Sequence, residues 1–408
     1  MSARDHKAVD LSSGAVAEAA SATGASARAS VQIGASWQDA TDAVLDTLDA
    51  TEPDLVIAFV DSYFAEHYGD VLERIGDATG AKHVIGCSGQ AVIGSALEAE
   101  GQTAISVMAF QLPMVMLTPL ALVPGADSND VFDSIEAAQA SAWLVFADPV
   151  STHAERLIAA IEARAPQTPI LGGIASARSE ANATAVFLDG RVYPRGAVLL
   201  GIAGDMEVHT LVAQGAEPIG EPWTVTDCES NIVTTIGSRP AVDVLREALD
   251  GLDEETRERA QRNLLVGLAI DEYRDEYGRG DYLVRNIMGF NEQSGAISIS
   301  AEPRVGQTIQ FQFRDAAAAD EDLVTQLADY RASLEPDQVV LGALLCACNG
   351  RGQSLFGAPN HDARALWDAL GPVPTAGLFC NGEIGPVGGQ TFLHGFTASI
   401  AFLTARSK

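Results

Sequence analysis

The hydrophobic pattern of the chain repeats a unit in which an apolar run, a helical pattern and a second apolar run follow one another. In the first unit, residues 55–60 are continuously apolar, residues 65–79 have helical spacing, and residues 83–89 form the second run. A short, continuous apolar run is typical of a strand buried on both faces, whereas apolar residues three or four apart are typical of a helix. The pattern therefore predicts a strand-helix-strand unit.

Two further units follow the same order. The second has runs at residues 142–147 and 169–175 with a helical pattern at 152–165, and the third spans residues 339–382 with its helix at 362–370. Repetition of this unit predicts a mixed α/β fold with internal pseudo-repetition. In such folds ligands tend to bind at the ends of the strands, and Gly86 and Cys87 lie at one of these ends.

Shorter segments complete the predicted fold. Trp37, Ala40, Val44 and Leu48 mark one face of a helix at residues 37–48. Alternating patterns typical of antiparallel strands occur at residues 103–110, 184–188, 197–203, 297–300 and 308–313.

Composition shifts predict the domain organisation. Residues 1–30 are rich in Ala, Ser and Gly and hold few large apolar groups, which favours a flexible tail. A boundary is expected near residues 238–240, because a helical, highly charged segment follows at residues 241–262. The chain is therefore predicted to form two lobes, residues 31–239 and 240–408.

The overall composition is that of a soluble protein with a large core. Of the 408 residues, 47% are hydrophobic, yet no stretch approaches the roughly 18 apolar residues of a membrane span. The start of the chain lacks an apolar signal core, and the five cysteines have no disulfide-framework spacing. These features predict a cytoplasmic location with reduced thiols.

The formal net charge of −30 narrows the range of partners. Nucleic acids and anionic membranes attract clustered Lys and Arg, and no basic stripe is present in the sequence. We therefore expect neither as a partner.

Candidate chemistry is concentrated in two Cys-Asn-Gly turns near the end of the chain. Cys348-Asn349-Gly350 continues into Arg351, and Cys380-Asn381-Gly382 continues into Glu383. Asn and Gly tolerate turn conformations whose backbone amides can converge on an anion. Arg351 is predicted to hold a carboxylate and Glu383 an amine, with both asparagines contributing, so the pattern favours a zwitterionic ligand.

Two other polar pairs follow apolar runs. Arg285-Asn286 and Arg314-Asp315 place polar groups at strand ends, where they are candidates for ligand contacts. A structural Arg–Asp ion pair is the alternative interpretation.

The ordered series of motifs resembles the FIST proteins (F-box and intracellular signal transduction) over roughly residues 35–405. The similar segments are Val84 to Gly89, Pro169 to Gly173, Gln214 to Gly220, Leu283 to Asn286, Cys348 to Gly352, and Cys380 to Gly389 with Phe392 to Thr397. The resemblance implies a sensory domain that binds a small ligand, with amino acids the favoured class. It implies no settled enzymatic activity, and no cofactor is predicted. Because the two FIST regions nearly fill the chain, any output is expected to pass through a separate signalling protein, or there is none.

Two alternatives stay open. Cys380 as nucleophile, His394 as base and Glu383 as orienting group would form a cysteine acyl-transfer or hydrolytic site. A protein-interaction adaptor is the other alternative. No metal site is predicted, because Cys346, Cys348 and Cys380 lack paired Cys-x-x-Cys spacing.

Overall fold

The computed structural model of the chain describes residues 14–125, 128–179 and 184–406, and it has a mixed α/β fold. These residues divide into two compact units. Unit 1 falls within Met1–Leu211, Leu327–Leu393 and Ser399–Lys408, and unit 2 within Val212–Gln326 and His394–Ala398. The predicted fold class, with two lobes and internal pseudo-repetition, is confirmed.

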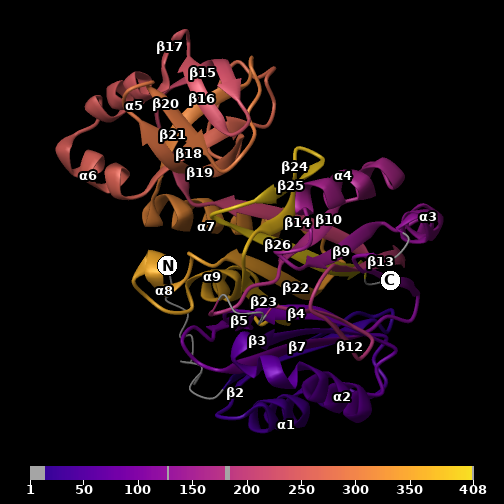
Figure 1. The fold of residues 1–408 in the computed structure, drawn as a ribbon. Helices are drawn as coiled ribbons and strands as arrows, with labels where there is room; N and C mark the ends of the chain where they lie inside the picture. The colour runs from indigo at the N-terminus through magenta and orange to yellow at the C-terminus, as the bar shows by residue number, and fades with distance from the viewer. Residues whose placement is uncertain (1–13, 126–127, 180–183, 407–408) are drawn as a thin grey trace. The chain divides into compact units, whose positions relative to one another are not determined.

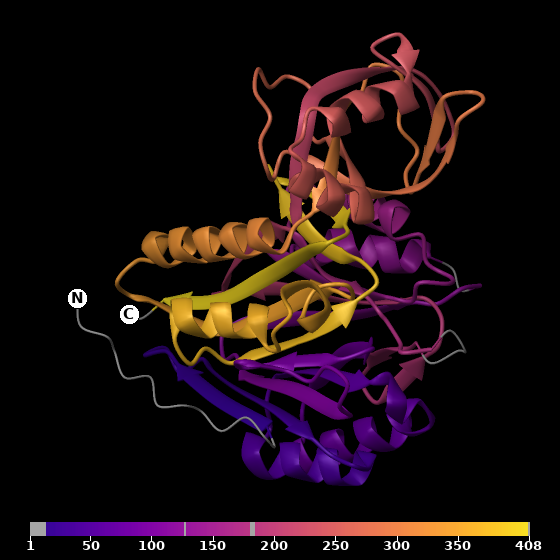
Figure 2. The ribbon, with the colours of Figure 1, turned by 90° about the vertical axis from the view of Figure 1, so that its left-hand side faces the viewer.

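The first sheet of unit 1 carries two helices on its outer face. Its strand order is β1 (Gly14–Ala20), β2 (Ser26–Ile33), β7 (Ala104–Gln111), β3 (Leu55–Asp61), β4 (His83–Gly89), β11 (Val186–Leu188) and β12 (Arg191–Tyr193). Helices α1 (Trp37–Leu48) and α2 (Tyr68–Thr79) cover the side away from the other strands of the unit, and a 3-10 turn (Ser62–His67) precedes α2 (Figures 1 and 2).

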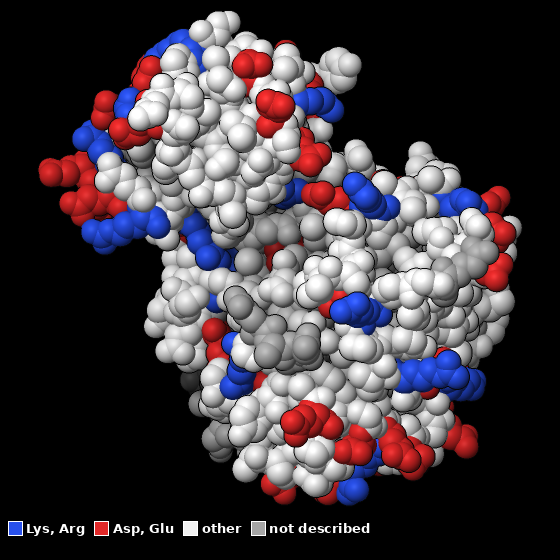
Figure 3. Space-filling view, viewed as in Figure 1, with Lys and Arg blue, Asp and Glu red and all other residues white. Residues whose placement is uncertain are grey.

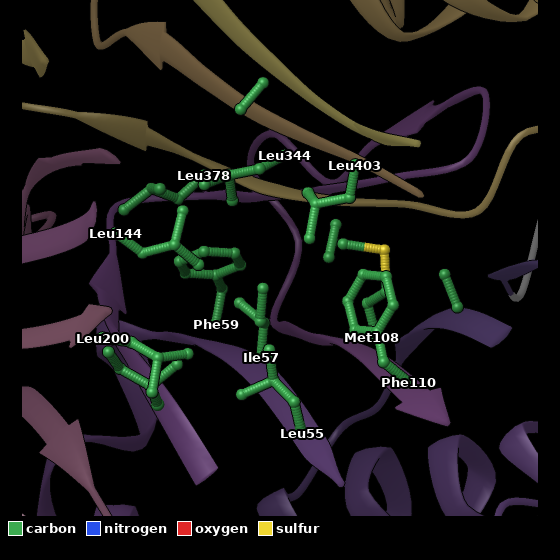
Figure 4. Packing of buried hydrophobic residues seen from close by; sticks show 14 of the residues in the cluster. Leu55, Ile57, Phe59, Met108, Phe110, Leu144, Leu200, Leu344, Leu378 and Leu403 are labelled. Carbon is green, nitrogen blue, oxygen red and sulfur yellow. The ribbon is translucent and has the colours of Figure 1, made fainter. Parts of the chain in front are cut away.

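Strand β3 shows why its sequence is continuously apolar. Leu55, Ile57 and Phe59 join the central core, while the alternate residues Val56 and Ala58 pack in a second cluster with the side chains of α1 and α2. Figure 4 shows the first set facing leucines from other sheets of unit 1. A strand buried on both faces needs apolar residues at every position.

Two six-stranded sheets complete unit 1. One has the order β25 (Gln390–His394), β24 (Glu383–Val387), β10 (Ile170–Ile174), β9 (Ala142–Ala147), β13 (Ala197–Gly204) and β8 (Val115–Leu122). The other has the order β14 (Glu207–Gln214), β26 (Thr397–Arg406), β22 (Gln338–Cys348), β23 (Thr375–Cys380), β5 (Val92–Gly94) and β6 (Leu97–Glu98). The helices of this part are α3 (Asn129–Ala138), α4 (Ala154–Arg164), α8 (Gln353–Phe356) and α9 (His361–Leu370).

Each of the three predicted repeats forms a parallel strand pair joined by a helix. The repeats are β3-α2-β4, β9-α4-β10 and β22-α9-β23, and one lies in each sheet of unit 1. Because both strands of a pair run in the same direction, the segments that follow them leave at the same edge.

Unit 2 is built on one seven-stranded sheet. Its order is β15 (Ala216–Glu229), β21 (Thr308–Arg314), β18 (Leu264–Ala269), β19 (Tyr282–Asn291), β20 (Ala296–Ile299), β16 (Ile232–Ile236) and β17 (Arg239–Pro240). Helices α5 (Ala241–Asp250) and α6 (Glu254–Arg262) pack on its apolar core, and α7 (Ala316–Ser333) follows β21.

The predicted tail differs from the structure in its second half. Residues 14–20 and 26–33 form β1 and β2, whereas residues 1–13 lie outside the described residues. The prediction assumed that small side chains bury too little surface, yet Ala27, Ala29 and Val31 are buried between the sheets of unit 1. The predicted boundary at residues 238–240 falls at β17, within unit 2.

Candidate ligand-binding site

The segments that leave the three parallel strand pairs are tied together by Ser176, two residues after β10. Its hydroxyl donates to the Phe379 carbonyl oxygen at 2.5 Å and accepts from the backbone N–H of Gln90 at 2.8 Å. The Ser88 hydroxyl donates to the Ser176 carbonyl oxygen at 3.2 Å. One residue of the second repeat thus bonds to both other repeats.

The two Cys-Asn-Gly turns meet at this place. The Asn349 side-chain amide donates to Oδ1 of Asn381 at 2.5 Å, and the Asn381 amide donates to the Ala175 carbonyl oxygen at 3.1 Å. Gln90 donates through Nε2 to the Asn349 carbonyl oxygen at 3.1 Å. The asparagines therefore connect the third repeat to the first and second.

A cleft of about 660 Å³ opens beside these turns. The residues that line it are Asp148, Pro149, Val150, Ala177, Arg178, Ser179, Thr184, Pro194, Arg195 and Asn381. Asn381 is the one lining residue that the sequence analysis named as a candidate. The other polar groups lie in loops that follow strands of unit 1.

Arg178 is a charged group of the cleft that three hydrogen bonds hold in place. Its Nε donates to the Gln90 carbonyl oxygen at 2.9 Å, and its Nη2 contacts the Asp61 carboxylate and the Gln102 carbonyl oxygen, both at 2.5 Å. Its Nη1 has no hydrogen bond to the residues that the structure describes. The guanidinium is thus fixed in place with one edge open.

Asp61 balances the charge of Arg178. Its side chain is fully buried, and burial raises the pKa of its carboxyl to about 6, although the Tyr63 N–H and Arg178 both favour the ionised form. Below that pH Asp61 is protonated, so its carboxyl group no longer compensates the positive charge of Arg178.

Arg195 and Asp148 supply the remaining charges. Arg195 is exposed in the loop before β13 and has no hydrogen bond or ion pair with any described residue. Asp148 is 1% exposed, and its carboxylate accepts from the Val150 and Ser151 N–H groups at 3.2 and 2.7 Å. It also accepts from the Thr184 hydroxyl at 3.3 Å. The cleft therefore presents both signs of charge.

Arg351, predicted to hold a carboxylate, has an internal partner instead. Its side chain is fully buried, and Nε and Nη2 donate to the Asp362 carboxylate oxygens at 2.7 and 2.9 Å. The guanidinium also lies over the Phe356 ring, 5.2 Å from its centroid. The prediction assumed that a large cation has no packing role in a Gly-rich turn, and here it has one.

Glu383 and Cys380 contact each other inside the protein. Both side chains are fully buried, and the Cys380 thiol donates to Oε1 of Glu383 at 3.4 Å. Burial raises the pKa of the Cys380 thiol well above its ordinary value, and its hydrogen bond with Cys346 acts in the same direction. Burial raises the pKa of the Cys87 thiol in the same way, whereas Cys348 is half-buried. None of these four candidates (Glu383, Cys380, Cys87 and Cys348) lines the cleft.

The remaining predicted residues belong to unit 2. Arg285 and Asn286 lie on β19, and Arg314 ends β21 with its guanidinium 5.3 Å from the centroid of the Phe396 ring. His394 is 3% exposed. Among the predicted residues, the structure thus brings together Asn349 with Asn381 and Cys380 with Glu383. It places Arg285, Asn286 and Arg314 in unit 2.

The sequence analysis missed Arg178, Arg195 and Asp148. Asp148 directly follows β9, at the same place in its repeat as Ser62 after β3 and Asn349 after β22. Its position at the end of a buried strand could have marked Asp148 as a candidate site residue. Arg195 lies in a loop with no repeat equivalent, so nothing in the pattern marked it.

Within the described residues, no group of three or more His, Cys, Asp or Glu side chains is arranged to hold a metal ion. None of the helices in the same part of the chain has the length and apolar character needed to cross a membrane.

Comparison with known families assigns the chain. Residues 54–239 match the FIST N domain, and residues 241–386 match the FIST C domain. The chain belongs to the FIST family. FIST domains are sensory domains of signal transduction, and the resemblance inferred from the ordered motifs is confirmed.

Similar FIST proteins occur in mycobacteria. The uncharacterized protein Rv0628c of Mycobacterium tuberculosis is 36% identical over 340 residues, which cover 81% of this chain and 86% of that protein. The uncharacterized protein Mb0898c of Mycobacterium bovis is 34% identical over 364 residues, 87% of this chain and 92% of that protein. An F-box/LRR-repeat protein of Arabidopsis thaliana is 38% identical over 71 residues, 17% of this chain and 13% of that protein.

Proposed function

We propose that this FIST protein is a sensor for a small carboxylate, most simply an amino acid, which binds in the cleft beside the Cys-Asn-Gly turns. The observation that carries the proposal is an exposed guanidinium without an internal partner among the described residues, Arg195, in the same cleft as the anchored guanidinium of Arg178. Strand ends are the usual ligand sites of α/β folds.

The charges of the cleft suit a zwitterion. Arg195 and the open Nη1 of Arg178 would hold the carboxylate, and Asp148 with Oδ1 of Asn381 would accept from the ammonium group. Each charge-assisted hydrogen bond contributes about 1.5–3 kcal/mol, so a few of them give an affinity in the range that a metabolite sensor needs. The ligand contacts first predicted for Arg351 and Glu383 are reassigned to these residues.

The structure offers less support for the cysteine-enzyme alternative. A nucleophilic cysteine needs its thiolate, and Cys380 is fully buried beside a carboxylate with a raised thiol pKa. The cytoplasmic location and a separate signalling partner stay predictions.

Thermal unfolding in the presence of amino acids and small organic acids tests the proposal. A ligand at a hundredfold excess over its Kd stabilises the wild-type protein by about 2.7 kcal/mol. Arg195→Ala removes the main carboxylate contact, so the same ligand concentration should stabilise that variant by about 1 kcal/mol or less.

Arg191→Ala is the matched control. Arg191 is an exposed arginine on the neighbouring strand β12 and does not line the cleft, so this variant should respond like the wild-type protein. Equal stabilisation of both variants would remove Arg195 from the ligand site, and no stabilisation of the wild-type protein by any carboxylate would refute the proposed ligand class.

A further inference from the structure

A buried carboxylate lies close to the turn that carries Asn349. Glu98 is 4% exposed, and its Oε1 accepts from the Ala363 N–H at 3.0 Å, in the first turn of α9. Its backbone N–H donates to Oδ1 of Asn360 at 2.7 Å. Its Oε2 is buried and has no hydrogen-bond partner among the described residues. The backbone N–H groups of Ala363 and Asp362 only partly offset the cost of desolvating the carboxylate.

The groups around Glu98 contain more negative than positive charge. From α9 it faces Asp362, which also accepts from His361 Nδ1 at 2.9 Å, and from its own segment it is close to Glu100. The buried cation of the cluster is Arg351, from the turn after β22. Three carboxylates thus lie in a cluster with one buried guanidinium, and the pair Arg351–Asp362 already neutralises itself.

Two atoms of this cluster are complementary but unpaired. Arg351 uses Nε and Nη2 for Asp362, while its Nη1 is buried without a partner in the described part of the chain. Oε2 of Glu98 is likewise buried without a hydrogen-bond partner among the described residues. An ionised Glu98 would compete with Asp362 for the guanidinium, whereas a protonated Glu98 leaves the observed pair undisturbed.

The turn formed by residues 348–352 connects this cluster to the cleft. At one end the Asn349 side chain bonds to Asn381, a lining residue, and the Asn349 N–H donates to the Cys380 carbonyl oxygen at 3.0 Å. At the other end Arg351 is held by Asp362, and the Gln353 N–H donates to Oε1 of Glu100 at 2.7 Å. Because Asn349 is only two residues from Arg351 in this turn, a shift of Arg351 is expected to displace Asn349.

We infer that Glu98 is the proton-binding group of a switch, and that loss of its proton redirects Arg351 and loosens the 348–352 turn beside the cleft. The protonated cluster is neutral apart from Glu100 at its edge. The deprotonated cluster holds one more buried negative charge, and its relief requires the Arg351 side chain to move. If the switch regulates ligand binding, it rests on the proposed function. The loosening of the 348–352 turn by itself does not depend on that function.

The electrostatic environment puts this event near neutral pH. Burial raises the pKa of the Glu98 carboxyl to about 8, and the negative charges of Asp362 and Glu100 act in the same direction. Ionisation is therefore expected between about pH 7 and 9, where Asp362, whose carboxyl pKa is lowered to about 2, stays ionised.

Hydrogen exchange of the ligand-free protein tests the switch directly. Between pH 6 and pH 9, after correction for the intrinsic exchange rate, protection of the Asn349, Arg351 and Gln353 amides should fall about tenfold, the change that one pKa unit of linkage produces. Glu98→Gln keeps the shape of the protonated acid and cannot ionise, so its protection should stay constant over this range.

Glu66→Gln, which removes an exposed carboxylate elsewhere in unit 1, is the control and should behave like the wild-type protein. Protection that does not change with pH in the wild-type protein, or that changes equally in Glu98→Gln, overturns the inference. The wild-type series decides the question even if Glu98→Gln fails to fold.

A second measurement separates this inference from the proposed function. Stabilisation by acetate, a minimal carboxylate probe, should be several-fold weaker at pH 9 than at pH 6 in the wild-type protein and equal at both values in Glu98→Gln. Failure of acetate and all amino acids to bind refutes the ligand proposal, whereas pH-dependent exchange of the turn would still support the switch. Binding of acetate together with pH-independent exchange would support the ligand proposal and overturn the switch.

Discussion

At the scale of single residues, Arg351 shows how a charged group in a Gly-rich turn can be structural. Its guanidinium is fully buried, forms two hydrogen bonds to Asp362 and covers the Phe356 ring. The planar fork of arginine matches a carboxylate at two points and stacks on an aromatic face, which a lysine cannot do equally well. The residue therefore positions the turn that carries Asn349.

Removal of Arg351 should destabilise the protein more than loss of a surface ion pair. Arg351→Met leaves Asp362 buried without its cation, which lowers the free energy of unfolding by about 3–5 kcal/mol. Urea unfolding measures the change. Arg364→Met, at an exposed arginine of the same helix as Asp362, should stay within about 0.5 kcal/mol of the wild-type protein.

The double variant Arg351→Met with Asp362→Leu provides the sharper comparison. Because it removes both charges, it should be more stable than Arg351→Met alone. A double variant that is less stable by the full sum of the two single changes would show that the pair is not the source of the loss.

The same cluster gives the protein a defined pH dependence of stability. The pKa of Glu98 rises from 4.5 in the unfolded chain to about 8 in the folded state, so the folded protein binds more protons between these values. The contribution of Glu98 to the free energy of unfolding is fully present below pH 4.5 and is lost as the pH rises toward 8. The free energy of unfolding should therefore decrease across this window, and Glu98→Gln should reduce the slope.

Asp362 acts in a separate window. Arg351 and His361 oppose the effect of burial and lower the pKa of its carboxyl to about 2, so its contribution is present above pH 3.8 and is lost as the pH falls toward 2. Unfolding titrations at fixed ionic strength distinguish the two groups. A slope between about pH 5 and 8 that is the same in Glu98→Gln would assign the dependence to other residues.

At the scale of elements, the three repeats share a glycine at one structural position. Gly86, Gly172 and Gly377 lie on the second strand of each pair and are in register with Ala58, Val145 and Leu345 of the first strand. A Cβ at each glycine would overlap the backbone carbonyl oxygen of its register partner. The pseudo-repetition therefore extends to a close approach of the two backbones that any side chain would prevent.

Gly377→Ala should be strongly destabilising because the obstructing atom is backbone. We expect a loss of about 3 kcal/mol, the upper end of overpacking penalties in protein cores, measured by urea unfolding. Gly76→Ala is the matched control in helix α2, where an added Cβ meets no atom within 4 Å. There the substitution should stabilise by about 0.5–1 kcal/mol, and the same sign for both variants would contradict the close-approach argument.

Sequence patterns predicted the elements with strong periodicity and missed the irregular strands. The helix expected at residues 37–48 agrees with α1, and the strand expected at 83–89 agrees with β4. The long strand β15 was missed because Pro218 and Pro222 interrupt its pattern, and its pairing with β21 shifts register between Ile219 and Trp223. Proline is tolerated at such irregularities, so its presence does not exclude a strand.

The candidate site was predictable in part, for a physical reason. Asn349 and Asn381 lie in turns that directly follow buried strands, and parallel strands bring such turns together. Arg178 and Arg195 lie in loops whose course depends on long-range packing, which local pattern does not encode. Arg351 was misassigned because its partner, Asp362, is on helix α9, beyond α8, and local pattern does not encode their contact.

At the scale of the whole molecule, the discontinuity of unit 1 was not visible in the sequence. Its chain leaves at Leu211, returns at Leu327, and contributes the late strands β22, β23 and β26 to one sheet. Composition signalled a change near residue 240, where the two FIST domain matches adjoin. The compact units are defined by strand pairing between segments far apart in the sequence. Their bounds therefore differ from those of the FIST N and FIST C domain matches.

The net charge of −30 affects the stability of the whole protein. Acidic side chains are prominent over α1, α2 and the 3-10 turn before α2, at the lower edge of the face in Figure 3. There Asp46, Glu66, Asp70, Glu73 and Asp77 are exposed. Of these, Asp70 pairs with His67 at 2.9 Å. Excess charge of one sign repels itself most strongly in the compact state, which lowers its stability relative to the unfolded chain.

Raising the ionic strength should therefore stabilise this protein. The Debye length falls from about 30 Å at 0.01 M salt to about 3 Å at 1 M, so most repulsion between surface carboxylates is screened at the higher concentration. We expect Tm to rise by a few degrees, on the order of 1 kcal/mol, between about 0.01 M and 1 M KCl. A variant with Glu73→Gln and Asp77→Asn carries two fewer negative charges on α2 and should gain less from the salt. If Tm falls with KCl in the wild-type protein, ion pairs such as Arg74–Asp42 outweigh the repulsion, because screening weakens attraction and repulsion alike.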